Sequence, residues 1–103
     1  MNWKAESVSI CVYVMIGFLW ATIYKTIYII ESQTFNNIDP EKFIQQLGYF
    51  SFVTLTTVGY GDISPAYPLT MSLANLEAIV GQLFPAIMIA CLVGLYQAEE
   101  QDK

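Results

Sequence analysis

Residues 56 to 62, Thr-Thr-Val-Gly-Tyr-Gly-Asp, have the types and spacing that could do chemistry in this chain of 103 residues. That chemistry is ion recognition rather than bond making, because a cation that sheds its water shell needs replacement oxygens in suitable number and strength. Gly59 and Gly61 can adopt backbone angles that are closed to other residues. Successive carbonyls can then point toward one axis, while the side chains of Val58 and Tyr60 point outward into surrounding protein.

Two long apolar segments flank this run, at about residues 5–30 and 69–97. As helices with a rise of about 1.5 Å per residue, both are long enough to cross a hydrocarbon core of about 30 Å. Irregular backbone is tolerated at membrane depth only where it is packed in protein or lines a water-filled cavity. The pattern therefore predicts two membrane-spanning helices around a loop whose backbone faces water or ions.

The stretch between the first apolar segment and the loop divides into two parts. Residues 31–39 form a polar connector that is expected to lie in water. Residues 40–54 are predicted to form a helix, because Asp39 can cap its free amides and Pro40 suits the first helical position. This helix is too short to cross a bilayer and too polar at its start, so we interpret it as a re-entrant helix.

Composition and charge narrow the class of protein further. The chain is 55% hydrophobic and 13% charged, whereas a soluble domain has about 25% charged residues. The net charge of −5 excludes a nucleic-acid partner, which would need clustered basic residues. The fold class predicted is an all-α membrane protein with both termini on one side, and no set of nucleophile, base and pocket indicates an enzyme.

The run from Thr56 to Asp62 resembles the signature of potassium channels, and the flanking helices resemble the small prokaryotic two-helix pore type. The resemblance implies one pore domain over residues 1–103, with filter 57–61 and a short cytoplasmic tail at 98–103. It implies a fourfold homotetramer in the cell membrane, both termini cytoplasmic, with K⁺ in the filter and no organic cofactor. The ion-binding residues so implied are Thr57, through its carbonyl and hydroxyl, and Val58, Gly59, Tyr60 and Gly61.

Two alternatives to a potassium-selective pore stay open from the sequence. A non-conducting membrane anchor or accessory pore subunit would have the same fold. A less selective cation channel is the other, although the presence of Tyr60 rather than an aspartate argues against it. A cytoplasmic regulatory domain or subunit outside this sequence is a further possible partner.

Residues around the filter are expected to support it. The carboxyl end of the re-entrant helix should direct its partial negative charge at the ion, and Tyr49, Phe50 and Phe52 are predicted to form an aromatic layer behind Tyr60. Certain members of the resembling family carry a glutamate where this chain has Val53. The predicted supporting residues are Tyr49, Phe50, Val53, Thr56 and Asp62.

The last apolar segment contains a candidate hinge. Gly81 stands 20 residues beyond Gly61, the spacing of the hinge glycine in the resembling channels, and Pro85 removes the helical hydrogen bond to the Gly81 carbonyl. The bend is either a moving gate or a static kink that widens a cavity, and the gate is expected at this hinge or at the filter. The residues predicted to line the cavity and inner mouth are Gln82, Ala86, Ile89 and Val93.

Charged and aromatic residues inside the apolar segments need partners. A charged Glu77 would be energetically unfavourable at that depth, so we predict a contact with Lys25. The alternative is that each of the two side chains reaches the membrane surface separately. Tyr24 and Tyr28 are interpreted as interfacial anchors. Cys11 and Cys91 are interpreted as small core residues, with a contact between them left open.

Overall fold

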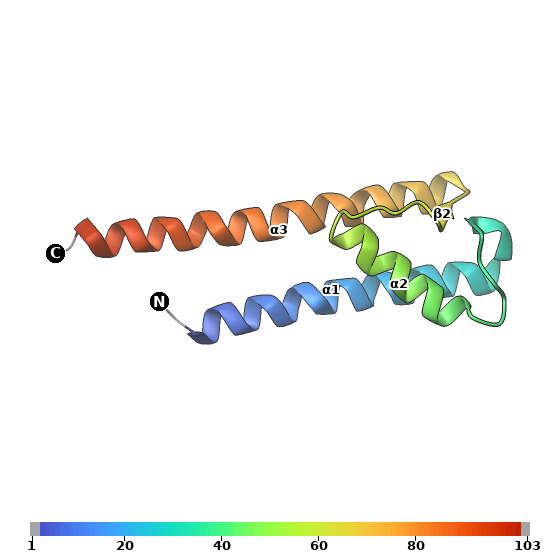
Figure 1. Ribbon diagram of the computed structural model, residues 1–103, viewed down its shortest axis with the longest axis horizontal. Coiled ribbons are helices and arrows are strands. Elements are labelled where there is room, and N and C mark those ends of the chain that lie inside the picture. Colours follow the sequence, from blue (N-terminus) through green and yellow to red (C-terminus); the bar gives the residue numbers. More distant parts are fainter. Residues whose placement is uncertain (1–2, 102–103) are drawn as a thin grey trace.

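The protein consists of two long antiparallel helices with a shorter helix inserted between them (Figure 1). The computed structural model describes residues 3–101 and measures 59 × 22 × 20 Å. The start of α1 and the end of α3 lie at the same end of the molecule (Figure 1). The helices are α1 (Trp3–Ile30), α2 (Phe43–Leu55) and α3 (Pro68–Gln101).

Helices α1 and α3 are long and apolar enough to cross a membrane, over Glu6–Ile30 and Pro68–Ala98. Their most apolar windows are only 17% and 6% buried inside the chain. A core helix of a soluble protein would be mostly buried, so these helices expose their apolar surface to something outside this chain. The prediction of an all-α membrane fold is confirmed. The predicted tail is partly helical, because α3 continues to Gln101, and residues 102 and 103 lie outside the described part.

Helix α2 begins at Phe43, three residues later than predicted. The Asp39 carboxylate accepts a hydrogen bond from the Glu41 amide at 3.0 Å, and the Asp39 carbonyl accepts one from the Lys42 amide at 2.9 Å. Asp39 therefore closes a turn that includes Pro40, and the first residue before the helix is Lys42, which makes no side-chain cap. A local Asp turn competes with helix capping for the same carboxylate, and here the turn is formed instead.

The connector after α1 is more ordered and more buried than predicted. It contains a short 3₁₀ helix, Ser32–Thr34, and the strand β1 (Phe35–Asn36), which pairs antiparallel with β2 (Ser64–Pro65). Thr34 and Phe35 are buried, so this part does not lie in water as expected. The Thr34 carbonyl accepts hydrogen bonds from the Ala66 amide at 2.8 Å and the Thr70 hydroxyl at 3.0 Å. The connector thus fixes the segment between residues 57–61 and α3.

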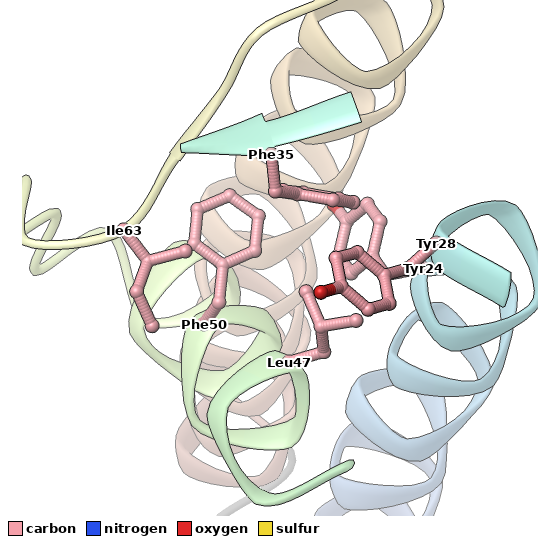
Figure 2. Close-up of a cluster of buried hydrophobic side chains, with 6 residues drawn as sticks. All are labelled: Tyr24, Tyr28, Phe35, Leu47, Phe50 and Ile63. Atoms are coloured by element: carbon pink, nitrogen blue, oxygen red, sulfur yellow. The ribbon is translucent and has the colours of Figure 1, made fainter. Parts of the chain in front are cut away.

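The core lies where α1, α2 and the connector meet at one end of the molecule. Figure 2 shows its side chains, which converge from α1, α2, β1 and the segment after the filter: Tyr24, Tyr28, Phe35, Leu47, Phe50 and Ile63. Tyr24 is 0% exposed and Tyr28 is 8% exposed. The interpretation of these two tyrosines as interfacial anchors is therefore wrong. Their rings pack inside the chain, with Tyr24 edge-on to Phe35 at 5.5 Å between ring centres.

Candidate functional site

Residues 57–61, which follow α2 and are called the filter strand here although they form no ladder with another strand, are tied to the last turn of that helix. Thr56 ends α2, and its amide and hydroxyl both donate to the Phe52 carbonyl, at 3.0 and 2.7 Å. The Val53 carbonyl accepts the amides of Val58 at 2.9 Å and Gly59 at 3.4 Å. Carbonyls at a helix end lack partners within the helix, and here the strand supplies them. Val53 supports the strand through its backbone carbonyl. The type of its side chain does not indicate this role.

The backbone of this strand alternates in the sign of φ. Thr57, Gly59 and Gly61 have φ of +61°, +58° and +84°, whereas Val58 and Tyr60 are not among the residues with positive φ. In a β-strand successive peptides face opposite ways. Alternation between right- and left-handed conformations turns them the same way, as it does in backbone anion nests. The strand therefore has the geometry needed to direct a row of carbonyls to one side.

Thr57 shares the positive φ, although the sequence analysis assigned that freedom to the glycines alone. A β-branched residue at φ of +61° is an outlier that costs about 1–3 kcal/mol and persists only when its surroundings impose it. Such strain is concentrated at functional sites. The Thr57 hydroxyl donates to the Thr56 carbonyl at 2.6 Å. No sequence signal at a threonine indicates this conformation, because it follows from the alternation of the whole strand.

The aromatic layer predicted behind Tyr60 is formed by one residue of the three. The rings of Tyr49 and Tyr60 stack with centres 6.4 Å apart and an angle of 7° between planes. Phe50 is 7% exposed and lies in the buried cluster instead. Phe52 packs edge-on against Phe18 of α1, at 5.2 Å between ring centres. Tyr49 and Phe50 are successive residues and point about 100° apart on α2, so they cannot both face residues 57–61. Phe52 lies about 60° from Tyr49 around the helix and reaches α1 instead.

Asp62, at the outer end of the strand, has backbone and side-chain partners. Its carboxylate accepts the Ile63 amide at 3.0 Å, and its carbonyl accepts the Asn37 side-chain amide at 3.1 Å. Partial desolvation raises the pKa of the Tyr49 phenol, and the nearby Asp62 carboxylate raises it further. The bond from Asn37 ties the end of residues 57–62 to the connector after α1.

Gly81 is a site of close packing between α3 and the end of α2. A Cβ atom built on Gly81 would overlap the Leu55 carbonyl oxygen and lie 2.7 Å from the Leu55 carbonyl carbon. The Tyr13 hydroxyl of α1 lies 3.2 Å from the Leu55 carbonyl and 3.2 Å from the Gly81 carbonyl. The Gly81 carbonyl needs this donor because Pro85 has no N–H to offer it. The sequence pattern indicated Gly81 and Pro85 but not Tyr13.

Glu77 is buried, but its partners are not those predicted. Its two carboxyl oxygens lie 2.8 Å from the Tyr24 hydroxyl and 2.6 Å from the Ser51 hydroxyl. The predicted pair with Lys25 is therefore not formed. Tyr24 and Lys25 are adjacent on α1 and point about 100° apart, and Tyr24 is the one of the two that faces α3.

The residues predicted to line the cavity and inner mouth lie on exposed parts of α3 in the single chain: Gln82, Ala86, Ile89 and Val93. Ile89 also borders an apolar cavity of about 370 Å³ between α1 and α3, together with Pro85 and Phe84. Cys11 and Cys91 are free and exposed. Their interpretation as core residues is wrong for the single chain.

A signal for the missed donors was present in α1. Tyr13, Trp20 and Tyr24 are spaced by seven and four residues, which places them on one face of a helix. Trp20 donates its ring N–H to the Leu73 carbonyl at 3.1 Å. This face therefore carries aromatic side chains whose polar ends reach α2 and α3, a pattern that hydropathy alone did not indicate.

The fold and the strand together define a membrane pore unit, with a re-entrant helix and an irregular carbonyl-bearing strand between two spanning helices. A protein-family model described as an ion channel matches residues 9–98. The chain belongs to this ion channel family.

Two curated proteins are similar to the chain over part of their length. One is "Two-pore potassium channel 5" of Arabidopsis thaliana, 31% identical over 75 residues, which is 73% of this chain and 18% of that protein. The other is "Putative potassium channel protein RPA4233" of Rhodopseudomonas palustris, 39% identical over 61 residues, which is 57% of this chain and 14% of that protein. The aligned part is thus less than a fifth of the length of either relative.

Proposed function

We propose that the chain is one subunit of a potassium-selective channel that conducts K⁺ passively through the strand at residues 57–61. The observation that carries this proposal is the alternating sign of φ at Thr57, Gly59 and Gly61 between two apolar helices. Carbonyls aligned in this way can replace the hydration shell of K⁺. The ligands would be the carbonyls of Thr57, Val58, Gly59 and Tyr60, with the Thr57 hydroxyl at the innermost site.

A homotetramer follows from the same proposal, because one strand supplies only one side of a coordination shell. The exposed fractions of Val58 and Tyr60 are 52% and 69%, which is high for apolar side chains that should face surrounding protein. Contact with neighbouring copies would cover them. The names of both relatives support potassium as the ion. We place the assembly in the cell membrane with both termini in the cytoplasm.

The decisive test is a flux assay on the purified chain in liposomes, comparing K⁺ with Na⁺. The parent should pass K⁺ in preference to Na⁺, and Gly59→Ala should abolish this flux, because alanine is strained at φ of +58°. Gly48→Ala is the matched control, since Gly48 lies inside α2 and a Cβ there meets nothing within 4 Å. It should retain the flux.

Other outcomes of this assay would favour the alternatives. Equal flux of the two ions would indicate a less selective cation channel. No flux from a chain that is folded and assembled would indicate an anchor or an accessory pore subunit.

A further inference from the structure

Glu77 connects all three helices through a chain of short oxygen–oxygen contacts. It is 0% exposed on α3, and so are Tyr24 on α1 and Ser51 on α2. One carboxyl oxygen of Glu77 lies 2.8 Å from the Tyr24 hydroxyl, and the other lies 2.6 Å from the Ser51 hydroxyl. The Ser51 hydroxyl also lies 2.7 Å from the Gly17 carbonyl of α1. The proposed conduction path uses none of these groups.

The two hydroxyl groups supply too few hydrogens for these three contacts. Three oxygen–oxygen contacts of 2.6 to 2.8 Å need three hydrogens. Tyr24 and Ser51 supply one each, and the Gly17 carbonyl is only an acceptor. The third hydrogen can therefore come only from the Glu77 carboxyl, which then donates to Ser51, while Ser51 donates to Gly17.

We propose that Glu77 is a neutral carboxylic acid and that its proton fixes α2 between α1 and α3, so that loss of this proton regulates the channel. The regulatory part rests on the proposed function, because α2 carries the filter strand. A neutral acid also avoids the cost of an unpaired charge at membrane depth.

In the part of the chain that the structure describes, the side chains in contact with Glu77 are Tyr24 and Ser51, and neither carries a positive charge. On α1 the titratable side chains that interact with Glu77 are Tyr24, which contacts it, and Tyr13. On α2 the contact is Ser51, which does not titrate in this range. A carboxylate at position 77 would therefore receive two hydroxyl donors, and the Gly17 carbonyl would lose its bond to Ser51.

Raising the pH should break the hydrogen bonds around Glu77. When Glu77 loses its proton, Ser51 can donate either to Glu77 or to Gly17, and one short contact is left without a hydrogen. The ionised Glu77 is then a buried charge without a positive partner, which disfavours the folded state by about tenfold or more. We therefore expect the unfolding temperature and the K⁺ flux of the parent both to fall as the pH is raised.

The test compares the parent with Glu77→Gln. The glutamine amide can donate to Ser51 and its carbonyl can accept from Tyr24, so this variant imitates the neutral acid but cannot be deprotonated. Glu41→Gln is the matched control, because Glu41 is exposed in the turn before α2. Infrared difference spectra of the three proteins at neutral pH should show a protonated carboxyl band that is lost only in Glu77→Gln.

Unfolding temperature and K⁺ flux are then measured from mildly acidic to alkaline pH. The parent and Glu41→Gln should lose stability and flux as the pH rises, while both profiles of Glu77→Gln should be flat. A missing carboxyl band in the parent, or the same stability profile in the parent and in Glu77→Gln, would overturn the proposal. If no protein conducts at any pH, the proposed function fails, and the infrared and unfolding data still decide the state of Glu77.

Discussion

Replacing Gly81 by alanine distinguishes a packing role from a hinge role at this position. The added methyl group would overlap the Leu55 carbonyl oxygen and lie 2.7 Å from its carbon, both of which belong to the backbone at the end of α2. Backbone atoms there cannot move aside as the tip of a long side chain can. The Tyr13 hydroxyl, bound to the same carbonyl, further restricts the shift.

The magnitude follows from two opposing effects. Alanine in place of glycine inside a helix stabilises by about 1 kcal/mol, whereas overpacking of a close contact costs about 1–3 kcal/mol or more. Because the overlap is with backbone, we expect Gly81→Ala to destabilise by about 2 kcal/mol. Gly94→Ala on the same helix meets nothing within 4 Å and should stabilise by up to about 1 kcal/mol.

The stability of both variants is measured by thermal and denaturant unfolding in detergent, monitored through tryptophan fluorescence. K⁺ flux in liposomes is the second measurement. The two glycines should shift the free energy of unfolding in opposite directions. If Gly81→Ala is as stable as Gly94→Ala while flux changes, Gly81 acts as a hinge and the close contact with Leu55 does not determine stability.

Two further predictions concern single side chains. Tyr13→Phe removes only a hydroxyl and should lower the free energy of unfolding by about 1 kcal/mol. The loss should be smaller in the Pro85→Ala background, because residue 85 can then donate its own N–H to the Gly81 carbonyl. An equal loss in both backgrounds would show that Tyr13 does not stabilise that carbonyl. Thr57→Gly should relieve the backbone strain at this positive φ and stabilise the protein by about 1 kcal/mol. The K⁺ flux should fall, because the hydroxyl at the proposed innermost ion site is lost. Raised stability with unchanged flux would contradict that ion site.

The main features of the fold follow from patterns that are local in the sequence. Two apolar runs of more than 20 residues, a short segment between them and a glycine-rich strand are enough to predict α1, α2 and α3 and their order. The start of α2 was misplaced because Asp39 can serve a turn or a helix cap with the same carboxylate. Local sequence does not decide between the two.

The partners of the buried polar groups could not be predicted, because they are distant in sequence. Glu77 meets Tyr24 and Ser51, which are 53 and 26 residues away. Lys25 was the obvious partner by charge, but the orientation of α1 brings its neighbour Tyr24 to α3 instead. Only the rotation of one helix against another settles this choice, and that rotation depends on all contacts together.

The position of the filter strand is determined by small residues and polar contacts rather than by apolar burial. Helix association in lipid has no hydrophobic driving force of its own, so close packing and hydrogen bonds must supply it. Gly17 admits Phe52, since a Cβ there would lie 2.5 Å from the nearest atom of the Phe52 ring, and Gly81 admits Leu55. Together with the contacts of Tyr13 and Glu77, these fix both sides of α2 within one chain. The side chains of Val58 and Tyr60 stay exposed in the single chain, which is consistent with the proposed assembly of several copies around the strand.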